Sequence, residues 1–350
     1  MKILLSLFFL ICLSSCDNNS FKSYYLTPIK DINNQMVMLL NTDIKVITDN
    51  PDVVDKAQEI ISTYHRYLDP SHNYQDINNL KTLNDNYNNT IDSSIILNDA
   101  LKTSFEYSTI SKGYFNPSIG SLSSLYKDYY DGLTHLDPNQ EKINEALNCE
   151  IKYQDLNNYI DIDDTKITFN KLNTCHQEVI IDLGGFSKGY ILDKVKEAIK
   201  DESYLISTSS SIIAHHKDKK NYDITITYLN EPILTIKKDN FALSSSSDEQ
   251  RYYFNEDNRR NHILNPYTGT NTNDYKSITL IANQNAGLLD ALSTAFYNMP
   301  LEDIKNIINN LKDELIIDYI ILDKDNNLHI TSNLKPHISA INKSYNLIEE

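Results

Sequence analysis

Apolar and polar residues alternate over many short segments of the chain, and longer segments between them carry apolar residues at helical spacing. A period of two is typical of strands and a period near 3.6 is typical of helices. The predicted strands are residues 36–48, 158–163, 166–170, 179–181, 222–229, 232–237, 241–246, 277–282, 318–323 and 328–332. The predicted helices are residues 51–67, 93–111, 187–199, 286–299 and 302–314. Because strands and helices mix throughout, the predicted fold class is α/β or mixed α+β, with mixed sheets and packed helices.

The segment 179–195, VIIDLGGFSKGYILDKV, reads as strand, turn and helix, in a chain with only 8 Gly. Asp182 would end the strand, and Gly184 and Gly185 permit a sharp turn that leaves no Cβ in the way of a ligand. Ser187 is predicted to cap the helix. Free N–H groups at such a helix start would attract an anion, most obviously a phosphate. The alternative is a tight strand-to-helix connection without a ligand.

The first 15 residues are predicted to be a targeting segment outside the fold. Lys2 precedes the apolar run ILLSLFFLICL, which is too short for a mature membrane span. The sequence LSSC ends at Cys16 and resembles the bacterial lipoprotein signal, in which that Cys is lipidated and becomes N-terminal. The alternative is an ordinary secretory signal with an incidental Cys. Residues 16–35 are predicted to be a tether, and residues 36–350 a domain without a visible internal boundary.

Composition limits the partners of this chain. The formal net charge is −16, which argues against a nucleic-acid partner and means that a phosphate ligand would need help from a cation. The chain has no Trp but 24 Tyr, so ring stacking must use Tyr or Phe. Cys149 and Cys175 are either a disulfide or two separate buried thiols. Without a CxxC motif or a His/Cys cluster, a zinc site is not expected.

Two further segments carry residue types suited to chemistry. Asp290 and Thr294 are four residues apart and share one face of a predicted helix, where oxygen ligands suit Mg²⁺. The alternative is a solvated Asp and a Thr that bonds its own backbone. His262, in NHILNPYTG, has a side chain suited to a general base, or it is a buried histidine with a structural role. The segment SKGYFNPSIG (111–120) would form a ring-binding loop or a simple turn.

The order of these motifs resembles one family. A lipoprotein signal, then GYFNPSIG, DLGGFSKGY, HILNPYTG and DALSTA resembles the ApbE family of flavinyltransferases, as does the earlier segment YLDPSHNYQDINNLKTLN. The resemblance extends from about Met38 to the C-terminus. It implies an ApbE-like fold and the Mg²⁺-dependent transfer of FMN from FAD to a Thr or Ser hydroxyl of a target protein.

The resemblance also implies roles for single residues. The carbonyl of Gly185, Asp290 and Thr294 would hold Mg²⁺, and His262 would take the proton from the acceptor hydroxyl. Lys188 and Asp182 would lie at the FAD pyrophosphate. The remaining FAD contacts implied are Met38, Tyr67, Tyr114, Phe115, Asn116 and Ile263.

The chain departs from the family pattern at four places. Asn116 and Asn265 stand where the family has an acid, in YFNP and HILNP. Serines stand where the family has glycines, in STSSS from Ser207 and SSSS from Ser244. These side chains are expected to narrow the flavin or target pocket. Two alternatives therefore remain, an FAD pyrophosphatase that gives FMN and AMP and a flavin-binding lipoprotein without catalysis.

Asp17 directly follows Cys16, and in many Gram-negative bacteria an Asp there keeps a lipoprotein in the inner membrane. The family's usual targets resemble redox subunits of that membrane. The expected location is therefore the periplasmic face of the inner membrane, with the lipid as anchor.

Overall fold

The computed structural model describes residues 21–350, and its mixed sheets and helices confirm the predicted fold class. The predicted signal peptide and Cys16 lie outside the described residues. The main element is a nine-stranded sheet, in which only the last pair of strands is parallel. In spatial order its strands are β1 (Lys22–Tyr25), β4 (Lys45–Thr48), β8 (Tyr204–Ser207), β9 (Ser211–His215), β12 (Asn240–Ser247), β15 (Tyr275–Ala282), β16 (Asp318–Asp323), β17 (Asn327–Ile330) and β19 (Asn346–Glu349).

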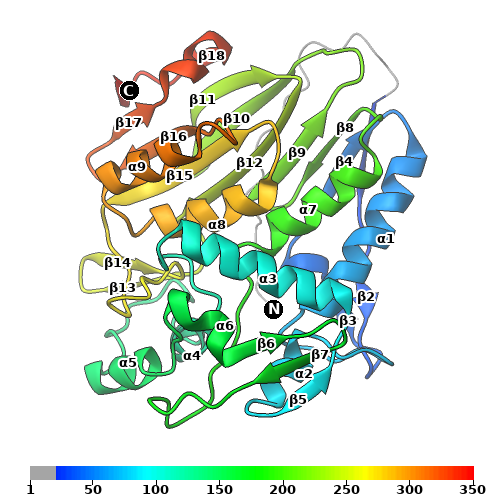
Figure 1. Cartoon of the computed structure of the whole chain (residues 1–350). Coiled ribbons are helices and arrows are strands. Elements are labelled where there is room, and N and C mark those ends of the chain that lie inside the picture. Colours follow the sequence, from blue (N-terminus) through cyan, green and yellow to red (C-terminus); the bar gives the residue numbers. More distant parts are fainter. Residues whose placement is uncertain (1–20) are drawn as a thin grey trace.

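Helices cover one face of this sheet, as Figure 1 shows. Helices α7 and α8 pack side by side on the central strands, α1 packs beside α7, and α3 contacts α1 and α8. The helices are α1 (Pro51–Leu68), α2 (Leu80–Asp85), α3 (Ile95–Ile110), α4 (Gly120–Tyr126), α5 (Gln140–Leu147), α6 (Leu156–Tyr159), α7 (Ser187–Ala198), α8 (Ala286–Phe296) and α9 (Leu301–Leu311). Three 3-10 helices span Leu39–Asn41, Tyr153–Asp155 and Ser332–His337.

A smaller sheet covers the opposite face of the main sheet, and two more small sheets and a hairpin complete the fold. The main sheet has a hydrophobic core on each face, and alternate residues of β9 contribute to the two cores. Ile213 faces the helices, whereas Ile212 and Ala214 face the smaller sheet. The smaller sheet consists of β10 (Tyr222–Tyr228), β11 (Glu231–Lys238) and β18 (Ile338–Ile341). The other strands are β2 (Ile29–Lys30), β3 (Met36–Val37), β5 (Thr90–Asp92), β6 (Ile160–Ile162), β7 (Lys166–Phe169), β13 (Tyr252–Asn255) and β14 (Asn258–Asn261).

The predicted tether is wrong over its described part. Residues 22–25 form β1, which pairs with β4 at the edge of the main sheet, and residues 29–30 pair with β3. The reason is apolar burial, because Tyr24, Leu26 and Ile29 pack against the core. The folded domain therefore begins about 14 residues earlier than the sequence predicted, as β1 starts at Lys22 and not at residue 36.

The continuous strand predicted for residues 36–48 is also wrong. Its two ends are β3 and β4, and a 3-10 turn separates them. Leu40 and Asn41 have φ angles of 52° and 54°, which lie in the left-handed region and reverse the chain there. The strand prediction is confirmed at the two ends, Met36–Val37 and Lys45–Thr48, which both pair with other strands.

The strand predicted for residues 179–181 is wrong, because these residues form no strand. The amide of Ile181 donates to Oδ1 of Asn84 (2.8 Å), and its carbonyl accepts from Nδ2 of the same side chain (2.9 Å). The carbonyl of Ile180 accepts from the amide of Gly120 (3.0 Å). An asparagine side chain on α2 thus satisfies the backbone groups for which the sequence predicted a neighbouring strand.

A disulfide joins Cys149 and Cys175, with a Cα–Cα distance of 4.4 Å, so the first of the two alternatives holds. The bond links the end of α5 to the loop before residue 179. Because a cross-link over 26 residues restricts the unfolded chain, replacing both cysteines with serine should lower the free energy of unfolding by about 3 kcal/mol. Urea unfolding of both proteins measures the difference. Reductant should destabilise only the parent protein, and an equal midpoint for the two proteins would contradict the expectation.

Candidate functional site

The turn between residues 182 and 188 lies where α7 begins, against α8. The carboxylate of Asp182 organises this turn, because its Oδ1 accepts from the amide of Gly184 (2.8 Å) and its Oδ2 accepts from the hydroxyl of Ser123 (3.0 Å). The predicted cap by Ser187 is wrong. Ser187 is the first helical residue, Phe186 is at the N-cap position, and no side chain caps the helix. The amides at the start of α7 therefore have no capping side chain.

Gly185 allows the turn to approach α8 closely. A Cβ on Gly185 would lie 3.3 Å from both the ring of Phe115 and the methyl group of Thr294. The Gly185 carbonyl accepts from the hydroxyl of Thr294 (3.2 Å). Gly189, one turn later, has no room at all, since a Cβ there would lie 2.1 Å from the carbonyl oxygen of Ala286. Two glycines thus set the close contact of α7 with α8.

Asp290 lies beneath this contact and is 2% exposed. Its Oδ2 accepts from the amide of Gly189 (3.1 Å) and lies 3.8 Å from Nζ of Lys188. Burial raises the pKa of Asp290, while Lys188 and the Gly189 amide partly offset this shift. A buried carboxylate with one cation at long distance has capacity for a further positive charge.

The oxygen atoms at this place suit a magnesium ion. The Gly185 carbonyl, the Thr294 hydroxyl and the Asp290 carboxylate are hard donors, and three protein ligands would leave positions for water or phosphate. Within residues 21–350 no group of three or more His, Cys, Asp or Glu side chains is arranged to hold a metal, so a site here would depend on this mixed oxygen set. The donors fit Mg²⁺ in type, and the ion itself stays a prediction.

His262 follows β14 and is half-buried. Its Nδ1 lies 3.2 Å from the carbonyl oxygen of Gln250, which can only accept, so Nδ1 carries the proton and Nε2 is left as an acceptor. Burial, together with the nearby charges of Arg251 and Lys188, lowers the pKa of His262 to about 4. The influence of Lys188 links His262 to the α7–α8 contact. At neutral pH the imidazole is uncharged and able to accept a proton.

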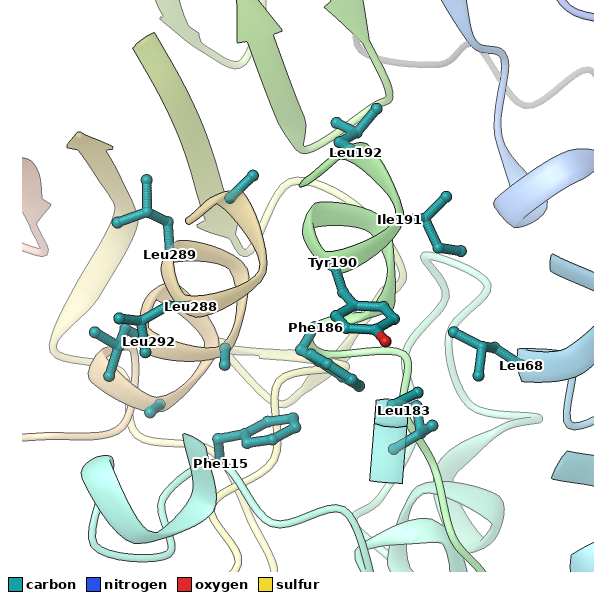
Figure 2. Packing of buried hydrophobic residues seen from close by; sticks show 14 of the residues in the cluster. Leu68, Phe115, Leu183, Phe186, Tyr190, Ile191, Leu192, Leu288, Leu289 and Leu292 are labelled. Carbon is teal, nitrogen blue, oxygen red and sulfur yellow. The ribbon is translucent and has the colours of Figure 1, made fainter. Parts of the chain in front are cut away.

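The aromatic residues predicted to contact FAD differ in exposure. Phe115 is 3% exposed and packs on Phe186, and Figure 2 shows both rings within the core around α7 and α8. Its side chain therefore supports the turn and does not face solvent. Tyr114 is half-buried beside the exposed ring of Tyr267, with ring centroids 4.9 Å apart. This pair offers an accessible aromatic surface, and sequence reasoning missed Tyr267.

The other predicted FAD contacts differ in exposure and in their partners. Met38 is 47% exposed, and Tyr67 on α1 is half-buried against the core. In the described part of the chain neither makes a hydrogen bond or an ion pair with Lys188. Ile263 is buried, and its carbonyl accepts from the side chain of Asn298 (3.2 Å). Hydrogen bonds join residues on α7, α8 and the turn, and an FAD contact of Met38, Tyr67 or Ile263 stays a prediction.

The side chain of Asn116 both donates and accepts hydrogen bonds, which explains an amide at this position. Its Nδ2 donates to the carbonyl of Ile151 (3.0 Å), and its Oδ1 accepts from the amide and the hydroxyl of Ser118 (3.0 and 2.9 Å). A carboxylate could not make the first of these bonds. Asn265 forms a turn in which its Oδ1 accepts from the amide of Tyr267 (2.8 Å), a bond that an aspartate could also make.

The serines at family glycine positions bond to each other and to α8. The Ser244 hydroxyl donates to the hydroxyl of Ser211 (3.1 Å), and the Ser246 and Ser293 hydroxyls are 3.0 Å apart. The Ser207 hydroxyl donates to the carbonyl of Thr208 (2.9 Å). These bonds account for the polar side chains at buried positions, and a narrower pocket stays a prediction.

Two surface hollows lie elsewhere on the molecule. One of about 430 Å³ lies beside α9 and the C-terminal residue Glu350, and another of about 550 Å³ lies between α4, α5 and residues 177–180. Neither is lined by a residue that the sequence assigned to the site.

Comparisons with known proteins find similar sequences and folds. The family model described as ApbE family matches residues 38–317. An ApbE protein from Thermotoga maritima is 22% identical and superposes with a TM-score of 0.73, covering 90% of this chain and 99% of that chain. The flavin transferase ApbE from Vibrio cholerae is 14% identical, with a TM-score of 0.69 and coverages of 91% and 99%.

A further similar structure is the flavinyl transferase ApbE from Pseudomonas stutzeri in its apo form. It is 16% identical, with a TM-score of 0.64, and the similarity covers 86% of this chain and 91% of that chain. At these identities the superpositions show a shared fold. No curated protein sequence matches this chain.

Proposed function

The chain belongs to the ApbE family, and from this premise we propose that it transfers FMN from FAD to a Thr or Ser hydroxyl of a target protein. The acceptor oxygen forms a bond to the phosphorus of the FMN half, the bond from that phosphorus to the AMP half breaks, and AMP leaves. The acceptor proton passes to the protein. The observation that supports the proposal is the α7–α8 contact, where Nζ of Lys188 lies 3.8 Å from Oδ2 of Asp290 and the Thr294 hydroxyl donates to the Gly185 carbonyl (3.2 Å).

Each residue has a separable task in this reaction. Nε2 of His262 is the free acceptor that takes the hydroxyl proton, since Nδ1 is held by the Gln250 carbonyl. Lys188 supplies positive charge for the pyrophosphate in a protein of net charge −16. Gly185, Asp290 and Thr294 would hold Mg²⁺, which supplies charge neutralisation for phosphoryl transfer when bound. The half-buried turn lets backbone groups approach the nucleotide.

Product analysis separates this proposal from its rivals. The protein is incubated with FAD, Mg²⁺ and the periplasmic domain of a membrane redox subunit as acceptor. A flavin-fluorescent acceptor band together with AMP supports transfer. Free FMN with AMP indicates hydrolysis, and unchanged FAD indicates binding without catalysis, so either of these results would overturn the proposal.

We further propose that the protein is anchored by lipid at Cys16 on the periplasmic face of the inner membrane. Within residues 21–350 none of the helices has the length and apolar character needed to cross a bilayer. Because β1 begins at Lys22, only residues 17–21 lie between Cys16 and this strand, and a chain of that length spans at most about 20 Å. The active site would stay near membrane-bound acceptors, which raises their effective concentration.

Membrane fractionation tests this location. The protein is expected to sediment with inner-membrane markers on a density gradient, and Cys16→Ser is expected to release it into the soluble fraction. Recovery chiefly with outer-membrane markers would contradict the location, and a Cys16→Ser protein that still sediments with membranes would contradict the lipid anchor.

A further inference from the structure

Arginine is rare in this chain and clustered in one place. The sequence has 32 Lys and Arg residues, of which only four are Arg, and three of these are Arg251, Arg259 and Arg260. Arg and Lys differ in use, because the planar guanidinium binds carboxylates and phosphates through paired hydrogen bonds, whereas the ammonium acts as a compact charge. In a lysine-rich chain, three arginines within ten residues beside His262 indicate that the guanidinium shape is needed there.

Two of the three have partners within the protein. Arg260 forms a two-pronged pair with Asp137, with Nη2–Oδ2 and Nε–Oδ1 distances of 2.9 and 3.2 Å. Arg259 lies 3.9 Å from the ring centroid of Tyr252, and its Nη1 lies 3.9 Å from Oδ1 of Asp248. Both guanidinium groups therefore stabilise the β13–β14 hairpin that carries His262.

Arg251 differs from both neighbours. Its side chain is exposed and makes no hydrogen bond or ion pair with any residue in the range 21–350, although the chain has 48 acidic residues. Its φ of 48° lies in the left-handed region, which is costly for a residue with a side chain. It directly follows Gln250, the residue whose carbonyl orients His262. A strained backbone thus holds a free guanidinium beside the candidate base.

We propose that Arg251 binds a phosphoryl oxygen of the flavin nucleotide at His262. This inference rests on the proposed function. The charge of Lys188, at the start of α7, also acts on His262, so the two cations would contact the nucleotide from two elements. The bound negative charge would offset both cations and make His262 a stronger base than in the free protein.

Binding measurements on matched variants test this role. Arg251→Gln is expected to weaken the binding of FAD and of inorganic pyrophosphate by about 10-fold or more, the scale of a charged hydrogen-bond pair. Arg251→Lys should recover only part of this affinity because it lacks the planar fork. The control Arg260→Gln removes a guanidinium from the same hairpin. It should lower the melting temperature and leave FAD affinity within about twofold, since its partner is Asp137.

A second readout is the NMR titration of His262. Arg251→Gln should raise the pKa of His262 in the free protein, because a positive neighbour is removed, whereas loss of a structural contact alone would not. Arg251→Gln with FAD affinity within twofold of the parent would overturn the inference. So would unchanged FAD affinity with a raised KM for the acceptor protein, which would place an acceptor anion at Arg251. Failure of the parent protein itself to bind FAD would instead overturn the proposed function, and this inference with it.

Discussion

Replacing His262 with alanine is expected to reduce flavin transfer by about 10²–10⁴-fold, the usual contribution of a general base, while FAD still binds. The imidazole is the group at this site with an uncharged acceptor nitrogen at neutral pH, because Nδ1 is held by the Gln250 carbonyl and burial lowers the pKa to about 4. Single-turnover rates measure the loss, and FAD fluorescence measures binding. A loss of less than threefold would show that His262 has a structural role and is not the general base.

His135→Ala is a matched control for this variant. It also removes a half-exposed imidazole that contacts tyrosine rings, but its partner is Asp131 on a surface loop. Transfer should stay within about twofold of the parent.

The pH dependence of transfer and of stability gives a further test of the role of His262. The lowered pKa means that the free protein keeps His262 as a base down to pH values near 4, so kcat/KM should not show a fall at pH 6.5 that depends on His262. For stability, the unfolded chain binds this proton more tightly than the folded one. His262 therefore favours folding above its ordinary pKa and loses that contribution as the pH falls through about 4.

Asp290→Asn is expected to abolish Mg²⁺-dependent transfer while the protein stays folded. The amide keeps the shape and can still accept from the Gly189 amide, but it removes the only carboxylate in the proposed oxygen set. We expect a loss of at least about 10³-fold in turnover, the scale on which preorganised charge acts in phosphoryl transfer. Retained turnover with an unchanged Mg²⁺ dependence would remove Asp290 from the metal site.

Stability distinguishes loss of the ion from loss of the fold. Because burial raises the pKa of Asp290, its ionisation opposes folding as the pH rises above the ordinary carboxyl range. Without Mg²⁺ at pH 7, Asp290→Asn should therefore melt no lower than the parent. The parent should gain stability from Mg²⁺, and the variant should not.

Asp193→Asn on the neighbouring helix is the control. Its two carboxylate oxygens accept from the amides of Ala286 and Gly287 (2.8 Å each) at the start of α8. This variant should alter stability and keep the response to Mg²⁺.

The sequence predicted long periodic elements well and connections poorly. The helix predicted at residues 51–67 is Pro51–Leu68, and the hairpin at residues 158–170 is β6 and β7. Propensity could not show that an asparagine of α2 would satisfy residues 179–181, because that contact joins positions 97 residues apart. The edge pairing of β1 depends in the same way on distant partners.

In the candidate site, too, the sequence predicted local spacing well and contacts between distant positions poorly. The four-residue spacing of Asp290 and Thr294 placed both on one helix face, and the structure adds what spacing could not show, the contact with the Gly185 carbonyl. Arg251 was missed because it belongs to no motif. The sequence does show that arginine is rare in this lysine-rich chain. Only the structure shows that Arg259 and Arg260 have partners within the protein.

The most direct test of the central claim is the mass of the acceptor protein after incubation with FAD, Mg²⁺ and this protein. We predict that intact-mass spectrometry finds the acceptor heavier by one FMN less one water, with the addition mapped to a Thr or Ser, and that the shift is absent when His262→Ala replaces the parent. An acceptor of unchanged mass, in the presence of bound or hydrolysed FAD, would contradict the account.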